Sequence, residues 1–187
     1  MDTADRDLVQ AARGGDGAAF ATLAERHAPR DRRFLATMTG DDHTAADLAQ
    51  DALRRALERL PQLAEPDRFA HWLLAIAANR CRNHLRAEVQ RRHAGSDALP
   101  EVADTGRRSA LSSLVRREDA ARLALAIDRL PILLREAFVL FHVEELAYAD
   151  IAALLGATVG TLQVRVHRAR ALLRQQLGAE AETWWRR

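Results

Sequence analysis

The sequence predicts an all-α protein made of two helical domains joined by a flexible linker. Aromatic residues are only 5% of the 187 residues, alanine, leucine and arginine abound, and no run reads convincingly as a strand. Apolar residues recur instead at three- and four-residue steps. From about Ala87 to Leu114 this period fails and Gly, Ser, Asp, Glu, Pro and Thr prevail, which indicates a linker. We therefore place the domains at residues 1–92 and 115–187, with the linker at 93–114.

Helix-start and helix-stop residues divide the first half of the N-terminal domain. We expect one helix from about Arg6 to Gly14 and a longer one from Asp16 to Gly40. Pro29 lies inside the longer segment, where it predicts a bend or a new start.

Two amphipathic segments follow in the same domain. Thr44-Ala-Ala-Asp47 resembles a capping box and opens a helix that runs to Leu60, where Pro61 stops it. A further helix is expected from about Phe69 to His84. The stretch from Asn79 to Arg92 holds five arginines against one glutamate, a density suited to a nucleic-acid backbone. The alternative is an ordinary helix terminus, where arginine favours the helix dipole.

The C-terminal domain carries the pattern of a DNA-reading helix-turn-helix between Tyr148 and Arg170. Gly156 suits the left-handed turn that ends the first helix, and Thr158 is placed to cap the second. A solvated surface helix is the plain alternative, but no acid lies between Val159 and Leu177. Arginine and glutamine can pair with guanine and adenine in a major groove. The outward-facing candidates are Gln163, Arg165, His167, Arg168, Arg170 and Arg174.

Composition argues against several other classes of protein. The net charge is only +2, so any affinity for nucleic acid must come from local patches. The lone Cys81 excludes an internal disulfide and fits a cytoplasmic location, and neither a signal peptide nor a membrane span is visible. Cys81 and His84 alone make a weak metal site, and no phosphate loop or nucleophile elbow is present. We expect no enzymatic activity, no cofactor, no metal and no membrane insertion.

Taken together, these segments resemble the extracytoplasmic function (ECF) group of the bacterial sigma-70 RNA polymerase sigma factors. The N-terminal domain is similar to region 2 of that family, notably over Ala46-Asp-Leu-Ala-Gln-Asp-Ala-Leu and Phe69-Ala-His-Trp-Leu-Leu-Ala-Ile-Ala-Ala-Asn-Arg. The C-terminal domain is similar to region 4, from Leu130-Pro-Ile-Leu-Leu-Arg-Glu-Ala-Phe to Gly160-Thr-Leu-Gln-Val-Arg-Val-His-Arg-Ala-Arg. A helix-turn-helix alone does not identify the family, because the motif occurs in many regulators. The resemblance depends on both domains being present in this order. The resemblance implies promoter-specific transcription initiation, with recognition of −35 and −10 elements and help in melting the DNA.

The resemblance also implies three functional surfaces. Residues that match the docking surface for the clamp helices of the largest polymerase subunit are Asp47, Gln50 and Asp51. Residues that match the −10 surface, whose loop holds an unstacked base, are Gln62, Arg68, Asn79, Arg80, Asn83 and Arg86. Residues that match the −35 surface are Thr161, Gln163, Val164, Arg165, His167 and Arg168, with Thr161 and Arg165 better placed for phosphates. The remaining partners implied are the flap of the second-largest subunit, promoter DNA and an anti-sigma factor.

Two recognition-helix positions depart from the family pattern. Gln163 stands where a basic residue is more common and Val164 where serine is, so a different −35 sequence is expected, with Val164 against a thymine methyl. The segment after Asp51 also lacks the aromatic residues usual there. The alternative function is a free-standing helix-turn-helix regulator that dimerises through its N-terminal bundle. The acidic docking surface and the arginine-rich helix distinguish the two, because a dimerisation bundle needs no second nucleic-acid face.

Overall fold

The computed structural model describes residues 4–94 and 114–178, and every regular element in these ranges is a helix. The predicted all-α class is confirmed. Most of the predicted linker lies outside the described residues, as do Trp184 and Trp185. The elements are α1 (Asp5–Arg13), α2 (Gly17–Thr39), α3 (Asp42–Arg59), the 3-10 turns η1 (Leu60–Gln62) and η2 (Pro66–Arg68), α4 (Phe69–Ala94), α5 (Leu114–Asp128), α6 (Ile132–His142), α7 (Tyr148–Leu155) and α8 (Val159–Leu177).

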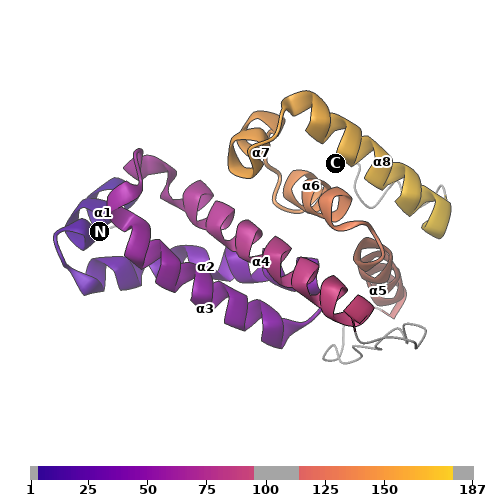
Figure 1. Ribbon diagram of the computed structural model, residues 1–187, viewed down its shortest axis with the longest axis horizontal. Helices are drawn as coiled ribbons and strands as arrows, with labels where there is room; N and C mark the ends of the chain where they lie inside the picture. The colour runs from indigo at the N-terminus through magenta and orange to yellow at the C-terminus, as the bar shows by residue number, and fades with distance from the viewer. Residues whose placement is uncertain (1–3, 95–113, 179–187) are drawn as a thin grey trace.

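Helices α1 to α4 form the N-terminal bundle (Figure 1), in which α2 packs against α1, α3 and α4. Its centre is aromatic and aliphatic, with Phe34, Leu35, Phe69 and Leu73 completely buried. Burial of such large side chains is the main favourable contribution to the stability of a domain of this size. The bundle therefore fixes the exposed faces of α3 and α4 relative to each other.

Helices α6, α7 and α8 form a second, smaller core around Phe138, Ile151 and Leu162, and α5 packs against α8. Figure 1 shows α6 and α7 lying along α4, with α8 on the side turned away from the N-terminal bundle. Helices α5 and α6 also contact α2. The two halves of the chain are thus in direct contact.

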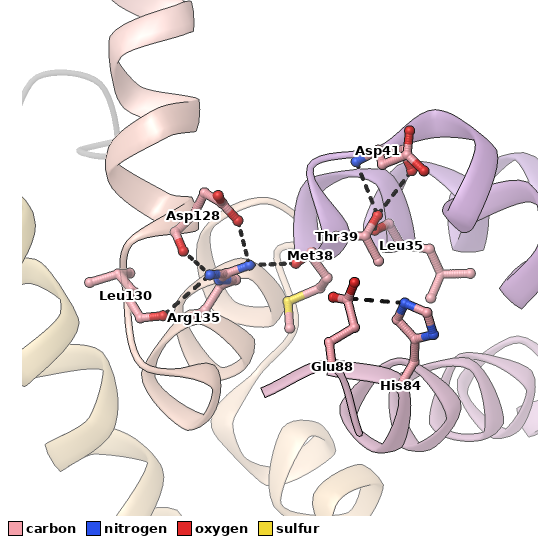
Figure 2. A network of polar contacts seen from close by, with 9 residues as sticks. All are labelled: Leu35, Met38, Thr39, Asp41, His84, Glu88, Asp128, Leu130 and Arg135. Carbon is pink, nitrogen blue, oxygen red and sulfur yellow. Dashed lines mark hydrogen bonds and ion pairs between the residues drawn. The ribbon is translucent and has the colours of Figure 1, made fainter. Parts of the chain in front are cut away.

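Arg135 of α6 anchors this contact from within the C-terminal half (Figure 2). Its Nη1 donates to Oδ1 of Asp128 at 2.7 Å and to the main-chain oxygen of Met38 at 2.6 Å. Met38 lies in the last turn of α2, where main-chain oxygens have no partner inside the helix. A side chain of the C-terminal half therefore completes the hydrogen bonding at the end of an N-terminal helix.

The prediction that a new helix starts at Pro29 is wrong, because α2 runs from Gly17 to Thr39 as one helix. Proline costs the helix one main-chain hydrogen bond. Leu23 before it and Phe34 after it are both fully buried in the same bundle. Packing on both sides of Pro29 outweighs the loss of one hydrogen bond.

The predicted capping box at Thr44 and Asp47 is also wrong, since α3 begins two residues earlier. The cap is Asp41, whose Oδ2 accepts from the main-chain nitrogen of Thr44 at 2.8 Å. Gly40, with a φ of 71°, ends α2 in the left-handed conformation just before it. Asp41 is a charged acceptor at the positive end of the helix, which favours it over Thr44 as the cap.

Helix α4 ends at Ala94 instead of near His84. Leu85 still packs into the core, with 8% of its surface exposed. The residues that follow it are mostly arginine, glutamate, glutamine and alanine, which have high helix propensity, and none of them is a helix breaker. The apolar period stops near His84 because the helix leaves the core there, not because the helix ends.

Asp31 is a carboxylic acid buried in α2, with 3% of its surface exposed and no hydrogen-bond partner for its Oδ2. Its pKa is raised from 3.8 to about 7, mainly by burial; Arg30 opposes this shift and Glu144 adds to it. The unfolded chain therefore releases this proton at lower pH than the folded one. The resulting contribution to stability is full below about pH 4 and is lost as the pH rises through about 7.

Replacing Asp31 with Asn should stabilise the protein at pH 8 by about 1–4 kcal/mol, because the amide removes a buried negative charge. The gain should shrink toward zero near pH 4, where the native carboxyl is already neutral. Urea denaturation at both pH values measures it, with Asp7→Asn on the exposed face of α1 as the control. An equal gain at both pH values would contradict the buried charge.

Candidate nucleic-acid and partner interfaces

The helix-turn-helix predicted from Gly156 and Thr158 is present. Gly156 ends α7 with a φ of 62°, in the left-handed region, and Oγ1 of Thr158 accepts from the main-chain nitrogen of Thr161 at 3.2 Å. The bend between α7 and α8 is 105°. An angle of this size is typical of helix-turn-helix motifs, in which the second helix enters the major groove.

Helix α8 buries one stripe and leaves the opposite face open. The stripe contains Leu162, Val166, Ala169 and Leu173. Of the predicted −35 residues, Arg165 is half-buried and the exposed ones are Thr161, Gln163, Val164, His167 and Arg168. Val164 keeps 51% of its surface exposed.

Arg170 does not belong to this open face, contrary to the sequence prediction. Its Nε donates to Nε2 of His142 at 3.0 Å, and its guanidinium lies 5.6 Å from the centre of the Phe141 ring. Both partners are on α6. Arg170 therefore fixes α8 against α6 instead of pointing toward a groove.

The predicted docking residues on α3 fall into two environments. Asp47 and Gln50 are exposed. Asp51 is half-buried and accepts hydrogen bonds from Arg54, Arg55 and Arg80. Partial burial opposes its ionisation, but these hydrogen bonds outweigh burial and lower the pKa of Asp51.

The contact between Asp51 and Arg80 joins two residues that the sequence analysis assigned to different surfaces. Asp51 holds the guanidinium of Arg80 on α4 by accepting from its Nε. Asp51 is predicted from the sequence to be exposed, but in the structure it is half-buried and has three arginine partners. Asp51 therefore positions Arg80, and Asp47 and Gln50 are the freely accessible part of this edge.

A groove between α2 and α3 borders Gln50, with a volume of about 620 Å³. Its lining combines small and apolar side chains with charged ones. Lining residues include Pro29, Arg32, Ala36, Ala46, Gln50 and Leu53. The contribution of α2 to this groove is not predictable from the sequence, because only the tertiary structure places α2 beside α3.

The predicted −10 residues lie on the η1–η2 loop and on α4. Arg80 is half-buried, and the exposed ones are Gln62, Arg68, Asn79, Asn83 and Arg86. Arg13 of α1 holds the loop in place. Its side chain donates hydrogen bonds to the main-chain oxygen of Leu60, at 3.2 Å, and to that of Leu63. Sequence analysis assigned no role to Arg13. Its side chain completes the hydrogen bonding of a loop that lacks regular structure.

Cys81 is completely buried, and burial together with the nearby Glu136 raises its thiol pKa to about 12. No group of three or more His, Cys, Asp or Glu side chains that could hold a metal ion occurs in residues 4–94 and 114–178. Within the same ranges, no single helix is long and apolar enough to cross a membrane, and α7 and α8 would be so only if the bent pair were taken together.

An exposed helix-turn-helix beside a second, arginine-rich helix is typical of a DNA-binding protein. Residues 23–92 match the family model for Sigma-70 region 2, and residues 120–173 match that for Sigma-70, region 4. The RNA polymerase sigma-H factor of Pseudomonas aeruginosa is 32% identical, over 92% of this chain and 93% of the relative. The ECF RNA polymerase sigma factor SigE of Mycolicibacterium smegmatis is 34% identical, over 87% of this chain and 64% of the relative.

A solved structure of CnrH in complex with the cytosolic domain of CnrY is also similar. It shares 28% identity and a TM-score of 0.69, over 95% of this chain and 99% of that chain. The chain belongs to the ECF group of the sigma-70 family of RNA polymerase sigma factors. It is a non-enzymatic factor that directs transcription initiation, and as a sigma factor it binds core RNA polymerase and promoter DNA.

Replacing Gly156 should destabilise the helix-turn-helix for a conformational reason alone. A Cβ at this position would meet nothing within 4 Å, but the φ of 62° is unfavourable for a β-branched residue. Gly156→Val should therefore be less stable than Gly156→Asn by about 1–2 kcal/mol, because asparagine tolerates the left-handed region. Thermal unfolding compares the two variants, and equal stability would contradict this account of the turn.

Proposed function

We propose that this sigma factor docks on the clamp helices of the largest polymerase subunit through the edge of α3 that carries Asp47 and Gln50, with Asp51 beside it. The single observation that carries the proposal is that the exposed Gln50 lines a largely apolar groove between α2 and α3. Grooves that combine apolar and charged side chains are suited to protein partners. The C-terminal domain then binds the flap of the second-largest subunit.

The −10 surface in this proposal is the η1–η2 loop together with α4. Melting a duplex costs stacking energy, which a protein can offset by holding a flipped base and the single-stranded backbone. Gln62 and Arg68 on the loop are assigned to the base. Backbone contacts are assigned to Asn79, Arg80, Asn83 and Arg86.

The −35 surface in this proposal is the exposed face of α8. Base edges are assigned to Gln163, Val164, His167 and Arg168, and phosphates to Thr161 and Arg165. The domain division supported by these surfaces is 1–92 for region 2 and 115–187 for region 4.

A protein inhibitor of the anti-sigma class is the remaining partner that we propose. CnrH, which is similar over nearly its whole length, was solved with the cytosolic domain of CnrY bound. The resemblance of the sequence to ECF sigma factors supports the same kind of control.

Changing Asp47 and Gln50 to Arg together should abolish co-purification with core RNA polymerase, because it reverses the charge of the docking edge. Asp51 is left intact, since it also holds Arg80. The matched control makes the same two changes at Asp7 and Gln10, which are exposed on α1. Unchanged helical content by circular dichroism validates the variant, and retained co-purification would refute the docking surface.

Replacing Gln163 with Arg should shift preference toward guanine at one position of the −35 element, with a discrimination of about 1–3 kcal/mol. Arginine presents two donors to O6 and N7 of guanine, whereas glutamine prefers adenine. Holoenzyme binding to a −35 library at two salt concentrations measures the effect. Gln175→Arg, which adds the same charge further along α8, should leave base preference unchanged. A uniform change in affinity for both variants would rule out Gln163 as a base reader.

A further inference from the structure

The ion pairs between the two halves of the chain all have the same polarity. In the described residues, three ion pairs cross it, and each has its arginine in the N-terminal half and its acid in the C-terminal half. They join Arg82 to Glu136, Arg30 to Glu144 and Arg68 to Asp150. One face of the C-terminal half thus presents carboxylates to the arginines of the N-terminal bundle.

The pair formed by Arg82 and Glu136 is the best enclosed of the three. Nε and Nη2 of Arg82 donate to the two carboxylate oxygens of Glu136 at 3.2 and 2.7 Å. The Glu136 side chain is 1% exposed and that of Arg82 is 16% exposed. A bidentate pair shielded from water is screened by salt much less than a surface pair. Arg82 also donates to Asn79, so the pair reaches into the proposed −10 face.

The other two pairs are more exposed. Nε of Arg30 donates to Oε2 of Glu144 at 2.7 Å, and the Glu144 side chain is only 5% exposed. Nη2 of Arg68 donates to Oδ1 of Asp150 at 3.2 Å, in a more exposed position. Arg68 belongs to the loop that is proposed to hold the −10 base.

Helix α7 also closes one side of that loop. A cavity of about 320 Å³ is lined by Gln62 and Arg68 from the loop and Trp72 from α4, and by Asp150 and Leu154 from α7. A base entering the loop from this side would meet the helix-turn-helix. Helix α8, by contrast, lies on the side of the C-terminal half away from the bundle (Figure 1), and its −35 residues other than Arg165 are exposed.

This arrangement cannot read both promoter elements at once. Elements named −10 and −35 are about 25 base pairs apart, which is roughly 85 Å along a straight duplex. The loop and the helix-turn-helix are in direct contact here, through Arg68 and Asp150. The two halves must therefore separate before the promoter is bound.

We propose that Glu136 and Asp150 act as an internal substitute for DNA phosphates toward Arg82 and Arg68 and, together with Glu144, hold the free sigma factor closed against its own −10 loop. The closed form leaves the −35 face open and pairs Arg68 and Arg82, at the edge of the −10 face, with acids of the C-terminal half. This inference rests on the proposed assignment of the −10 surface. Separation of the halves releases Arg82 and Arg68 together for the single strand.

The test uses the full-length protein with donor and acceptor dyes on cysteines introduced at Gln10 and Gln175; native Cys81 is completely buried. Glu144→Lys combined with Asp150→Lys should lower energy transfer between the dyes. It should also strengthen binding of a short dye-labelled single-stranded DNA of mixed sequence by about tenfold, because apparent affinity scales with the open fraction. The control adds the same charge through Asp7→Lys and Glu145→Lys, and should change neither readout beyond a small general increase in DNA affinity.

A charge swap distinguishes separation of the two halves from unfolding as the cause of lower energy transfer. Glu144→Arg alone should open the molecule, and Glu144→Arg with Arg30→Glu should restore energy transfer, because the pair re-forms with its charges reversed. The proposal is overturned if the double lysine variant stays closed, if the swap fails to restore closure, or if the open variant binds the single strand no better than the control. Co-purification of the parent with core polymerase tests the proposed function separately from these outcomes.

Discussion

The chain contains no lysine, so all 28 of its strongly basic side chains are arginines. A guanidinium stays charged and offers five donors in a planar fork, which suits carboxylates and phosphates equally well. Arginines that do not bind main-chain oxygens or aromatic side chains of the protein therefore have two further kinds of partner, an acid of the same chain or the backbone of a nucleic acid. The architecture depends on which of the two each of these arginines has.

Several arginines are used inside the protein. Arg13 holds the η1–η2 loop, Arg135 completes the end of α2, and Arg170 fixes α8 to α6. Arg80 is held by Asp51, at the junction of the docking edge and the −10 face. These contacts connect surfaces with different tasks, so a change at Asp51 reaches both the α3 edge and the −10 helix.

The two DNA-binding surfaces differ in how accessible they are. The recognition face of α8 is exposed, whereas the −10 loop lies against α7 and Arg82 is paired with Glu136. An acid that can take a phosphate's place gives a reversible cover, because the same arginine exchanges one anionic partner for another.

The order of the helices, the helix-turn-helix and the family resemblance all follow from the sequence. Local signals were sufficient there, because Gly156, Thr158 and the apolar stripe of α8 act within a few residues of one another. The same local rules failed at Pro29, where packing distant in sequence overrides a helix breaker, and at the end of α4, where a helix outlasts its apolar period. They also favoured Thr44 as a cap, although Asp41 was the stronger acceptor nearby.

What the sequence by itself determined is the set of residues that bear charge on each helix, since helical periodicity decides which of them face outward. Only the tertiary structure decided their partners. Asp51 and Arg80 are 29 residues apart, and Arg82 and Glu136 are 54 residues apart. No local pattern relates such positions, because an ion pair depends on distance in space, and that distance is set by how α3, α4 and α6 pack.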